Sequence, residues 1–343
     1  MATAVPVIVA LDWTPNTNHT GFFVAKEKGW YEQEGLDVKL LSPHVDGYKK
    51  TPASRVTDRT ATFALAPSET VLSNYTSPDR DNLVSVATLL QDDLSAIVTL
   101  KSSGISRPKE LDGKKYASYG ARYEGRIVQA LIKADGGKGD YAEDTPEKLG
   151  IWETLLKGEA DATWVFRGWE GVEAQLKGVE LNDFVLKDFG IPYGYSPVVV
   201  AHPDTLQNKP EVVRAFLRAT AKGFEYAYKN VELAASILED LSKKEEPGLE
   251  SPLDPSLVLA SQRVLSEHYL NADGRWGIQS DKVWDTYLDW LSAEGLLTSA
   301  RQSRAPVEGV SASLDDLRAG KVGEKISRES VKSAELFTNE YLG

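Results

Sequence analysis

The stretch PVIVALDWTPNTNHTGFF, residues 6–23, joins a short apolar run to the start of a helical pattern. The run 6–11 is typical of a buried strand, and Asp12 and Trp13 come directly after it. A turn rich in Pro, Asn and Thr follows, and a helix is expected near Thr20, with Asn18 or Thr20 as its N-cap. The pattern predicts a strand, a turn and a helix, with polar and aromatic side chains gathered where the strand ends.

Apolar runs alternate with helical patterns along the rest of the chain, which is typical of an α/β fold. Further strands are expected at 38–42, 62–66, 83–90, 96–100, 115–119, 162–166 and 198–201. Helices are expected at 20–34, 68–74, 107–111, 123–134, 152–157 and 169–176, and longer ones follow His202 at 211–229, 231–241, 255–270 and 281–294. Two lobes fit this order: residues 1–94 with 200–343, and an inserted lobe of 95–199. Since ligands bind at the carboxyl ends of such strands, we expect a ligand cleft between the lobes.

Composition excludes several classes of function. The 343 residues include 39 Lys and Arg against 51 Asp and Glu, a net charge of −12, so a basic surface for nucleic acid is not expected. There is no Cys, which excludes disulfides, thiolate metal sites and a cysteine nucleophile. No apolar run is long enough to span a membrane.

The first residues allow two expectations about the compartment. Residues 1–11 lack a basic segment and a cleavage site, so they do not form a signal peptide. We expect a cytoplasmic protein if Met1 is the native start. Otherwise the chain is a mature periplasmic or other extracytoplasmic domain that was given a new Met.

The opening motif supplies the first group of candidate ligand-binding residues. Trp13 offers a face on which a flat ligand can stack, and Asp12, Asn16 and His19 offer polar groups that can bind its edge. By the residues alone, a capped turn above a core tryptophan is the favoured explanation.

The stretch DATWVFRGWEG, residues 161–171, again places polar and aromatic side chains after an expected strand. Arg167 and Trp169 are expected to face the cleft. Glu170 could accept hydrogen bonds from an amino group and a ring N–H at once. An acid in the first turn of a helix is also favoured by the helix dipole alone, so both interpretations stay open.

Three further segments bring candidates to the cleft. In YASYGARYEG, residues 116–125, free N–H groups at a strand-to-helix turn could bind a carboxylate, phosphate or carbonyl oxygen. In PYGYSP, residues 192–197, a tyrosine could close over a ligand. In APSET, residues 66–70, a hydroxyl and a carboxylate begin a helix, which an ordinary N-cap also explains. The candidates in these segments are Tyr119, Gly120, Arg122, Tyr123, Tyr195, Ser68 and Glu69.

Catalytic and metal-binding patterns are absent from the sequence. The four histidines, at 19, 44, 202 and 268, form no i, i+4 pair, and no zinc-protease, nucleophile-elbow, phosphate-loop or dinucleotide-binding motif occurs. We therefore expect neither a metal site nor a cofactor.

Several motifs resemble the substrate-binding proteins of the thiamin-pyrimidine family. They are DWTPNTNHTG at 12–21, VAKEKGWYEQEGLDV at 24–38, GWEGVEA at 168–174, GVELN at 178–182, RWG at 275–277 and FTNEYL at 337–342. The closest type is the formylaminopyrimidine-binding component of a thiamin-salvage ABC transporter. The resemblance implies a two-lobed periplasmic-binding-protein-like fold of type II, with the ligand between the lobes. The segment at 24–38 is shared with nitrate, sulfonate and taurine binders.

The same superfamily includes the fungal thiamin pyrimidine synthase, an iron enzyme. The resemblance aligns its Schiff-base lysine with Leu65 and its donor histidine with Glu69, and its cysteine loop has no counterpart here. These departures argue against synthase chemistry. Another departure is Arg167, where the family often has Tyr, which makes a phosphorylated or acidic ligand a further hypothesis.

We therefore expect a monomeric protein that binds a thiamin-precursor-like pyrimidine or a related small molecule without catalysis. An ABC transporter permease is the expected partner if the chain is exported. Two alternatives stay open. One is a divergent pyrimidine synthase-like enzyme of thiamin biosynthesis, and the other is a transport binder of the sulfonate or nitrate type.

Overall fold

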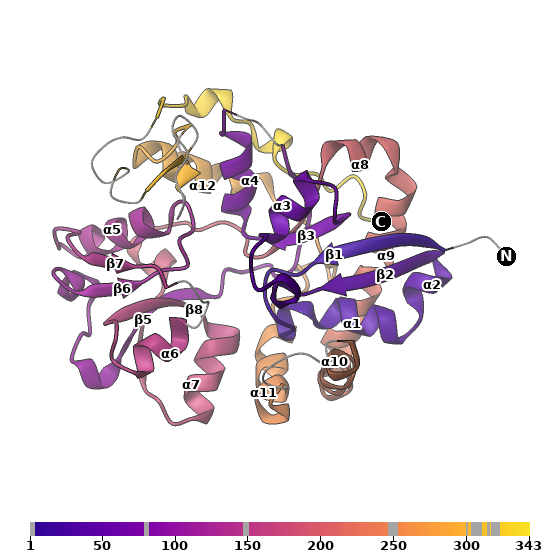
Figure 1. Ribbon diagram of the computed structural model, residues 1–343, viewed down its shortest axis with the longest axis horizontal. Coiled ribbons are helices and arrows are strands. Elements are labelled where there is room, and N and C mark those ends of the chain that lie inside the picture. The colour runs from indigo at the N-terminus through magenta and orange to yellow at the C-terminus, as the bar shows by residue number, and fades with distance from the viewer. Residues whose placement is uncertain are drawn as a thin grey trace.

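The computed structural model describes residues 4–78, 82–146, 151–245, 253–299 and 323–343, together with 301–302, 311–313 and 316. Two five-stranded sheets lie side by side (Figure 1). The first has the spatial order β2 (Leu36–Leu41), β1 (Val5–Ala10), β3 (Phe63–Ala66), β10 (Val198–Ala201) and β4 (Val84–Thr88). The second has the order β7 (Ala142–Asp144), β6 (Lys115–Ala117), β8 (Ala162–Phe166), β5 (Ser95–Leu100) and β9 (Leu181–Phe184).

Both sheets are mixed, and the chain passes between them twice. β1 runs parallel to β2 and β3, whereas β10 runs antiparallel to β3 and β4. In the second sheet β6 runs parallel to β7 and β8, whereas β5 runs antiparallel to β8 and β9. The crossings lead from β4 to β5 and from β9 to β10. The expected two-lobed α/β fold is thus confirmed.

Helices cover both sheets (Figure 1). Those of the first lobe and its C-terminal extension are α1 (Thr20–Glu27), α2 (Trp30–Gln33), α3 (Pro52–Thr57), α4 (Ser68–Tyr75), α8 (Pro203–Asn208), α9 (Pro210–Lys229), α10 (Val231–Glu245), α11 (Pro255–Ser266) and α12 (Asp281–Ala293). Those of the second lobe are α5 (Glu124–Ala134), α6 (Ile151–Leu156) and α7 (Val172–Leu176). Residues 301–302 and 311–312 form a short parallel pair, β11 and β12.

Two glycines allow α1 and α9 to pack closely against each other. A Cβ atom at Gly223 would collide with the carbonyl oxygen of Gly21, and one at Gly21 would collide with the ring of Phe224. Phe63 of β3 stacks on Phe216 of α9 with ring centroids 4.3 Å apart. This contact packs α9 against the first sheet, and the turn after β1 projects from that sheet.

The structure corrects several expected elements. Gly29, with φ of +65°, divides the helix expected at 20–34 into α1 and α2. Residues 108–111 form a 3₁₀ turn, and the helix expected at 169–176 begins as a π turn, Arg167–Gly171. β7, β9, α3 and α8 were not expected, because they are short and have little hydrophobic periodicity of their own.

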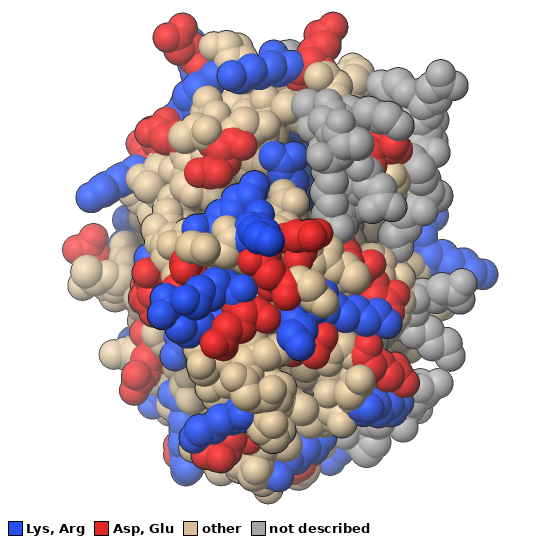
Figure 2. Space-filling model, turned by 90° about the vertical axis from the view of Figure 1, so that its left-hand side faces the viewer, with Lys and Arg blue, Asp and Glu red and all other residues tan. Residues whose placement is uncertain are grey.

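The surface of the second lobe carries both signs of charge. Figure 2 shows Lys and Arg interspersed with Asp and Glu on this face. Ion pairs such as Arg107–Asp135 and Lys115–Asp144 hold acids and bases together there. Among the described residues, no helix combines the length and the apolar character needed to cross a membrane.

Candidate functional site

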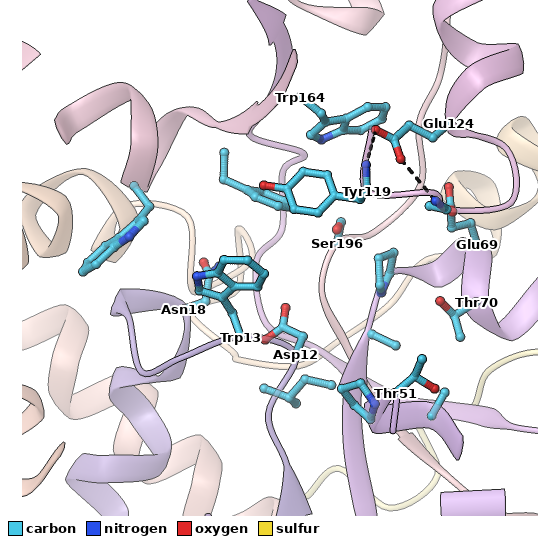
Figure 3. Close-up of a pocket in the computed structure, with 18 of the residues that line it drawn as sticks. Asp12, Trp13, Asn18, Thr51, Glu69, Thr70, Tyr119, Glu124, Trp164 and Ser196 are labelled. Atoms are coloured by element: carbon cyan, nitrogen blue, oxygen red, sulfur yellow. Dashed lines mark hydrogen bonds between the residues drawn. The ribbon is translucent and has the colours of Figure 1, made fainter. Parts of the chain in front are cut away.

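A cavity of about 360 Å³ lies between the lobes and receives side chains from both sheets. Figure 3 shows Trp13 and Asp12 facing Tyr119 and Trp164, with Glu69 and Glu124 together at one end. The described residues that line it are Asp12, Trp13, Asn16, Asn18, Thr51, Pro52, Ala53, Leu65, Ala66, Pro67, Glu69, Thr70, Tyr119, Ala121, Glu124, Trp164, Phe166, Trp169, Glu170, Tyr193 and Ser196.

The turn after β1 forms the first-lobe wall. Asn16 caps the 3₁₀ turn Thr17–His19, because its side chain accepts a hydrogen bond from the Asn18 amide at 2.9 Å. The N-cap of α1 itself is His19, which makes no side-chain cap hydrogen bond, so neither Asn18 nor Thr20 has the expected capping role. The ring of Trp13 meets that of Tyr119 from the second lobe at 6.2 Å in an edge-to-face arrangement. Aromatic contacts thus join the two lobes across the cavity.

Helix α11, together with Tyr269 just after it, holds this turn in place through hydrogen bonds. Thr17 Oγ1 lies 2.5 Å from Ser261 Oγ, and Thr20 Oγ1 donates to Gln262 Oε1 at 2.6 Å. The Tyr269 hydroxyl donates to the Thr17 carbonyl at 2.6 Å. All five residues are buried, so the turn has a fixed orientation toward the cavity.

Glu170 stands on the second-lobe wall, in the π turn after β8. Its Oε2 accepts a hydrogen bond from the Phe166 amide at 2.9 Å. Burial raises the pKa of Glu170 to about 7, although the Phe166 amide acts in the opposite direction. Near neutral pH this carboxyl group can therefore donate a hydrogen bond as well as accept one.

Glu124 organises the turn between β6 and α5. Its carboxylate accepts hydrogen bonds from the Tyr116 hydroxyl at 2.6 Å, the Tyr119 amide at 3.1 Å and the Ala121 amide at 3.2 Å. The Gly120 amide donates to Ser118 Oγ at 2.9 Å. The N–H groups expected to receive an anionic ligand are thus already occupied within the chain.

Glu69 lies next to Glu124 at the end of the cavity (Figure 3). Its Oε2 accepts a hydrogen bond from the Tyr193 hydroxyl at 3.1 Å. Burial and then the charge of Glu124 raise the pKa of Glu69 to about 7. Burial likewise raises the pKa of Glu124. This end of the cavity is acidic and closely enclosed.

The charged side chains of the lining are all acids. Asp12, Glu69, Glu124 and Glu170 line the cavity, and none of the described lining residues is Lys, Arg or His. Six aromatic rings surround these acids: Trp13, Tyr119, Trp164, Phe166, Trp169 and Tyr193. The arrangement suits a flat ligand that is rich in N–H donors.

The two arginines expected at the ligand lie elsewhere. Arg167 is about half exposed, lies outside the lining and has its Nε 3.6 Å from Asp183 Oδ2. Arg122 is buried, donates to Thr76 Oγ1 at 2.6 Å and to the Thr298 carbonyl, and so joins the lobes away from the lining. Neither guanidinium is placed to receive a phosphate in the cavity.

The remaining sequence candidates divide into two groups. Seven candidates line the cavity: Asp12, Trp13, Asn16, Glu69, Tyr119, Trp169 and Glu170. Five lie outside the lining: His19, Ser68, Gly120, Tyr123 and Tyr195. Of these, His19 contacts Asp12 from behind the lining, and the Tyr195 hydroxyl accepts a hydrogen bond from the Ser280 amide at 3.0 Å. The role of each as a ligand contact remains a prediction.

Sequence reasoning missed three prominent lining residues. Glu124 and Tyr193 stood inside motifs already singled out, beside Tyr123 and Tyr195. Trp164 stood in the strand at 162–166, where the two-residue period of a strand places it on the same face as Phe166, another lining residue. In the described part of the chain, no group of three His, Asp or Glu is arranged to hold a metal ion.

Comparison with known proteins places this geometry in context. The family described as NMT1/THI5 like matches residues 16–234. The formylaminopyrimidine-binding protein of Halalkalibacterium halodurans is 27% identical over 298 residues, 85% of this chain and 86% of that protein. The 4-amino-5-hydroxymethyl-2-methylpyrimidine phosphate synthase of Legionella pneumophila is 26% identical over 285 residues, 81% of this chain and 84% of that protein.

A solved structure agrees in fold. The periplasmic aliphatic sulphonate binding protein of Escherichia coli matches with a TM-score of 0.63 and 12% identity, over 99% of this chain and 99% of that one. At this identity the likeness concerns the fold alone. The family resemblance read from the sequence motifs is confirmed, as is the fold of the binding-protein type.

Proposed function

The chain belongs to the NMT1/THI5-like family, and we propose that its cavity binds an unphosphorylated aminopyrimidine without bond-making chemistry. The observation that carries the proposal is Glu170, a partly buried carboxyl group that stands among aromatic rings in the cavity lining and has a pKa raised to about 7. A 4-aminopyrimidine presents an amino donor beside a ring nitrogen. A carboxyl group that both accepts and donates pairs with these two atoms at once.

The charge of the lining supports an unphosphorylated ligand. A buried phosphate or sulfonate needs a cation or several free N–H donors to replace its hydration. The described lining has four acids and no cation, and the amides of Tyr119 and Ala121 already donate to Glu124. Arg167, which the sequence suggested for an anionic group, pairs with Asp183 outside the lining.

Departures from the synthase argue for binding alone. The positions aligned with the synthase lysine and histidine, Leu65 and Glu69, both line the cavity, and they supply an apolar side chain and an acid. The chain has no Cys for the cysteine loop. We propose that a monomer presents its ligand to an ABC transporter permease from an extracytoplasmic position, as the fold of the binding-protein type supports.

A thermal-shift panel tests the proposal. The probes are 4-amino-5-hydroxymethyl-2-methylpyrimidine, its phosphate ester, a formylaminopyrimidine, the sulfonate MOPS and nitrate. A ligand at 100 times its Kd stabilises the folded state by about 2.7 kcal/mol, so the unphosphorylated pyrimidines should raise the unfolding midpoint. The proposal fails if only the phosphate ester, MOPS or nitrate raises it. Product formation during incubation with pyridoxal phosphate and iron would instead support the synthase alternative.

A further inference from the structure

The two turns that form the cavity walls meet on helix α11, which lies between α7 and α10 (Figure 1). Thr17, in the turn after β1, has its Oγ1 2.5 Å from Ser261 Oγ. Ser261 Oγ in turn donates a hydrogen bond to the carbonyl oxygen of Gly168, in the π turn after β8. One buried hydroxyl group of α11 thus contacts both turns, although they belong to different lobes.

The direction of these hydrogen bonds follows from the number of protons. A serine hydroxyl has one proton, and Ser261 donates it to Gly168. Ser261 must therefore accept from Thr17, whose hydroxyl is the donor of that pair. The result is a directed chain from Thr17 through Ser261 to Gly168. Removal of the Ser261 hydroxyl breaks both hydrogen bonds at once.

Apolar packing holds the π turn against the same face of α11. Leu265 follows Ser261 by one helical turn, and a Cβ atom at Gly168 would lie 2.7 Å from Leu265 Cδ2. Trp169, the next residue of the π turn, packs against the hydrophobic core that includes Leu265. The lack of a side chain at Gly168 therefore permits this close approach of the second lobe to α11.

These contacts set the spacing of the cavity walls. Glu170 lies two residues after Gly168 and lines the cavity from the second lobe. Asn18 lies next to Thr17 and lines it from the first lobe. Ser261 is fully buried and lies outside the lining, so it can act on a ligand only through the two turns.

We propose that Ser261 is a positioning residue for ligand binding, which holds the two turns at the spacing at which both walls contact the ligand. The proposal rests on the proposed function, which places an aminopyrimidine between those walls. With the bridge in place, the protein has this spacing before the ligand arrives. Without it, the lobes separate more readily, and the fraction of molecules competent to bind falls.

Calorimetric titration with 4-amino-5-hydroxymethyl-2-methylpyrimidine is the first test. In Ser261→Ala we expect about three- to tenfold weaker binding. The matched control is Ser266→Ala on the same helix, whose buried hydroxyl donates to the Arg263 carbonyl at 3.2 Å. Because that hydrogen bond stays within α11, the control should keep the affinity of the unmutated chain. Circular dichroism verifies that each variant is folded.

The distance between the lobes distinguishes positioning from a general loss of stability. The chain has no Cys, so Lys133→Cys on α5 and Lys229→Cys at the end of α9 provide unique sites for two spin labels. Pulsed electron paramagnetic resonance should give a longer or broader distribution of label distances in ligand-free Ser261→Ala than in the labelled parent or labelled Ser266→Ala. Saturating pyrimidine should return the variant to the distribution of the parent, which a general loss of stability would not do.

A second pair of variants tests the packing of the π turn, and it also serves if Ser261→Ala does not fold. Gly168→Ala should weaken binding by about tenfold, because its Cβ collides with Leu265. Leu265→Ala removes the side chain that this Cβ meets. The double variant should therefore bind more tightly than Gly168→Ala alone, since the two changes are coupled through one contact.

The possible outcomes separate the two proposals. Unchanged affinity or an unchanged label distance in ligand-free Ser261→Ala would overturn the positioning role and leave the proposed function standing. Equal loss of affinity in Ser266→Ala, or equal affinity of Gly168→Ala and the double variant, would do the same. If the unmutated chain does not bind the pyrimidine, the proposed function itself fails, whatever the distance between the labels.

Discussion

His19 Nε2 lies 2.8 Å from Asp12 Oδ1; the imidazole is fully buried, whereas the carboxylate reaches the cavity. Nδ1 of the same ring accepts the Asn16 amide at 3.2 Å. The tautomer that satisfies both contacts carries its proton on Nε2 and donates it to Asp12. His19 is therefore a positioning residue for Asp12.

Replacing His19 should weaken ligand binding through Asp12. In His19→Gln we expect a three- to tenfold loss of affinity for the hydroxymethyl aminopyrimidine, on the order of 1 kcal/mol, since Asp12 loses its fixed orientation. The midpoint of thermal unfolding should also fall, because the buried Asn16 amide loses its hydrogen-bond acceptor. Calorimetry and thermal melts measure the two effects.

The control is His268→Gln. His268 forms an equally short pair with Asp92, at 2.8 Å, but lies outside the cavity lining. The His268→Gln substitution should leave the affinity for the hydroxymethyl aminopyrimidine unchanged. An equal loss of affinity in both variants would show that His19 does not act through Asp12.

Glu170 should contribute more to the binding free energy than any other polar side chain of the cavity. Glu170→Ala removes both the oxygen that accepts from the ligand's amino group and the O–H that donates to its ring nitrogen, whereas Glu170→Gln keeps one acceptor and one donor. In Glu170→Ala we expect a loss on the order of 2–4 kcal/mol in binding free energy, and in Glu170→Gln a much smaller loss. Isothermal titration of the hydroxymethyl aminopyrimidine measures this. Unchanged affinity in Glu170→Ala would reduce Glu170 to a residue that complements the helix dipole.

Glu69 should make the free protein less stable as pH rises. Its pKa is about 7 in the folded chain, against 4.5 as the ordinary value. Between these two pH values the folded chain keeps a proton that the unfolded chain has lost, so stability falls across that window. At pH 8 the cost is on the order of 3 kcal/mol.

In urea unfolding, Glu69→Gln should therefore have a higher free energy of unfolding than the unmutated chain at pH 8. This difference in free energy should vanish near pH 4.5. Glu173→Gln provides the comparison, because the Glu173 carboxylate is partly exposed and pairs with Lys177. A gain that does not change with pH would mean that the effect comes from packing and not from charge.

The close approach of α1 to α9 should not tolerate a methyl group. In Gly223→Ala the new Cβ would meet the Gly21 carbonyl oxygen, a backbone atom that cannot move alone. We expect destabilisation by roughly 1–3 kcal/mol or more from overpacking. Gly171→Ala is the control, since its Cβ would have only an ordinary contact at 3.6 Å, and a helical Ala should be neutral or slightly favourable. Similar unfolding midpoints for both variants would contradict the close packing.

Arg122 should stabilise the contact between the lobes. Arg122→Met keeps the aliphatic stem and removes donors to Thr76 Oγ1 and the Thr298 carbonyl. Acceptors left unpaired cost about 1–3 kcal/mol, so the urea midpoint should fall. Arg107→Met removes a surface pair with Asp135 and should change stability much less. The bridging role fails if the two variants lose equal stability.

The sequence by itself determined most of the strands and long helices and the places where those strands end. Alternating apolar runs predicted strands, and the turns after β1 and β8 bring Asp12, Trp13 and Glu170 to one cavity, because these strands of the two sheets both end at the cleft between the lobes. The opening motif and the GWEG motif also predicted the family.

Only the tertiary structure decided which side chains face the cavity. Glu124 closes the turn that was expected to offer free amides, and Arg167 lies against Asp183. Tyr193, two residues before the expected Tyr195, lines the wall. Irregular segments have no period of 2 or 3.6 from which a direction could be read. Side-chain direction there is set by partners distant in sequence, such as Ser280 for Tyr195 and Glu69 for Tyr193, and these meet only once the lobes have folded.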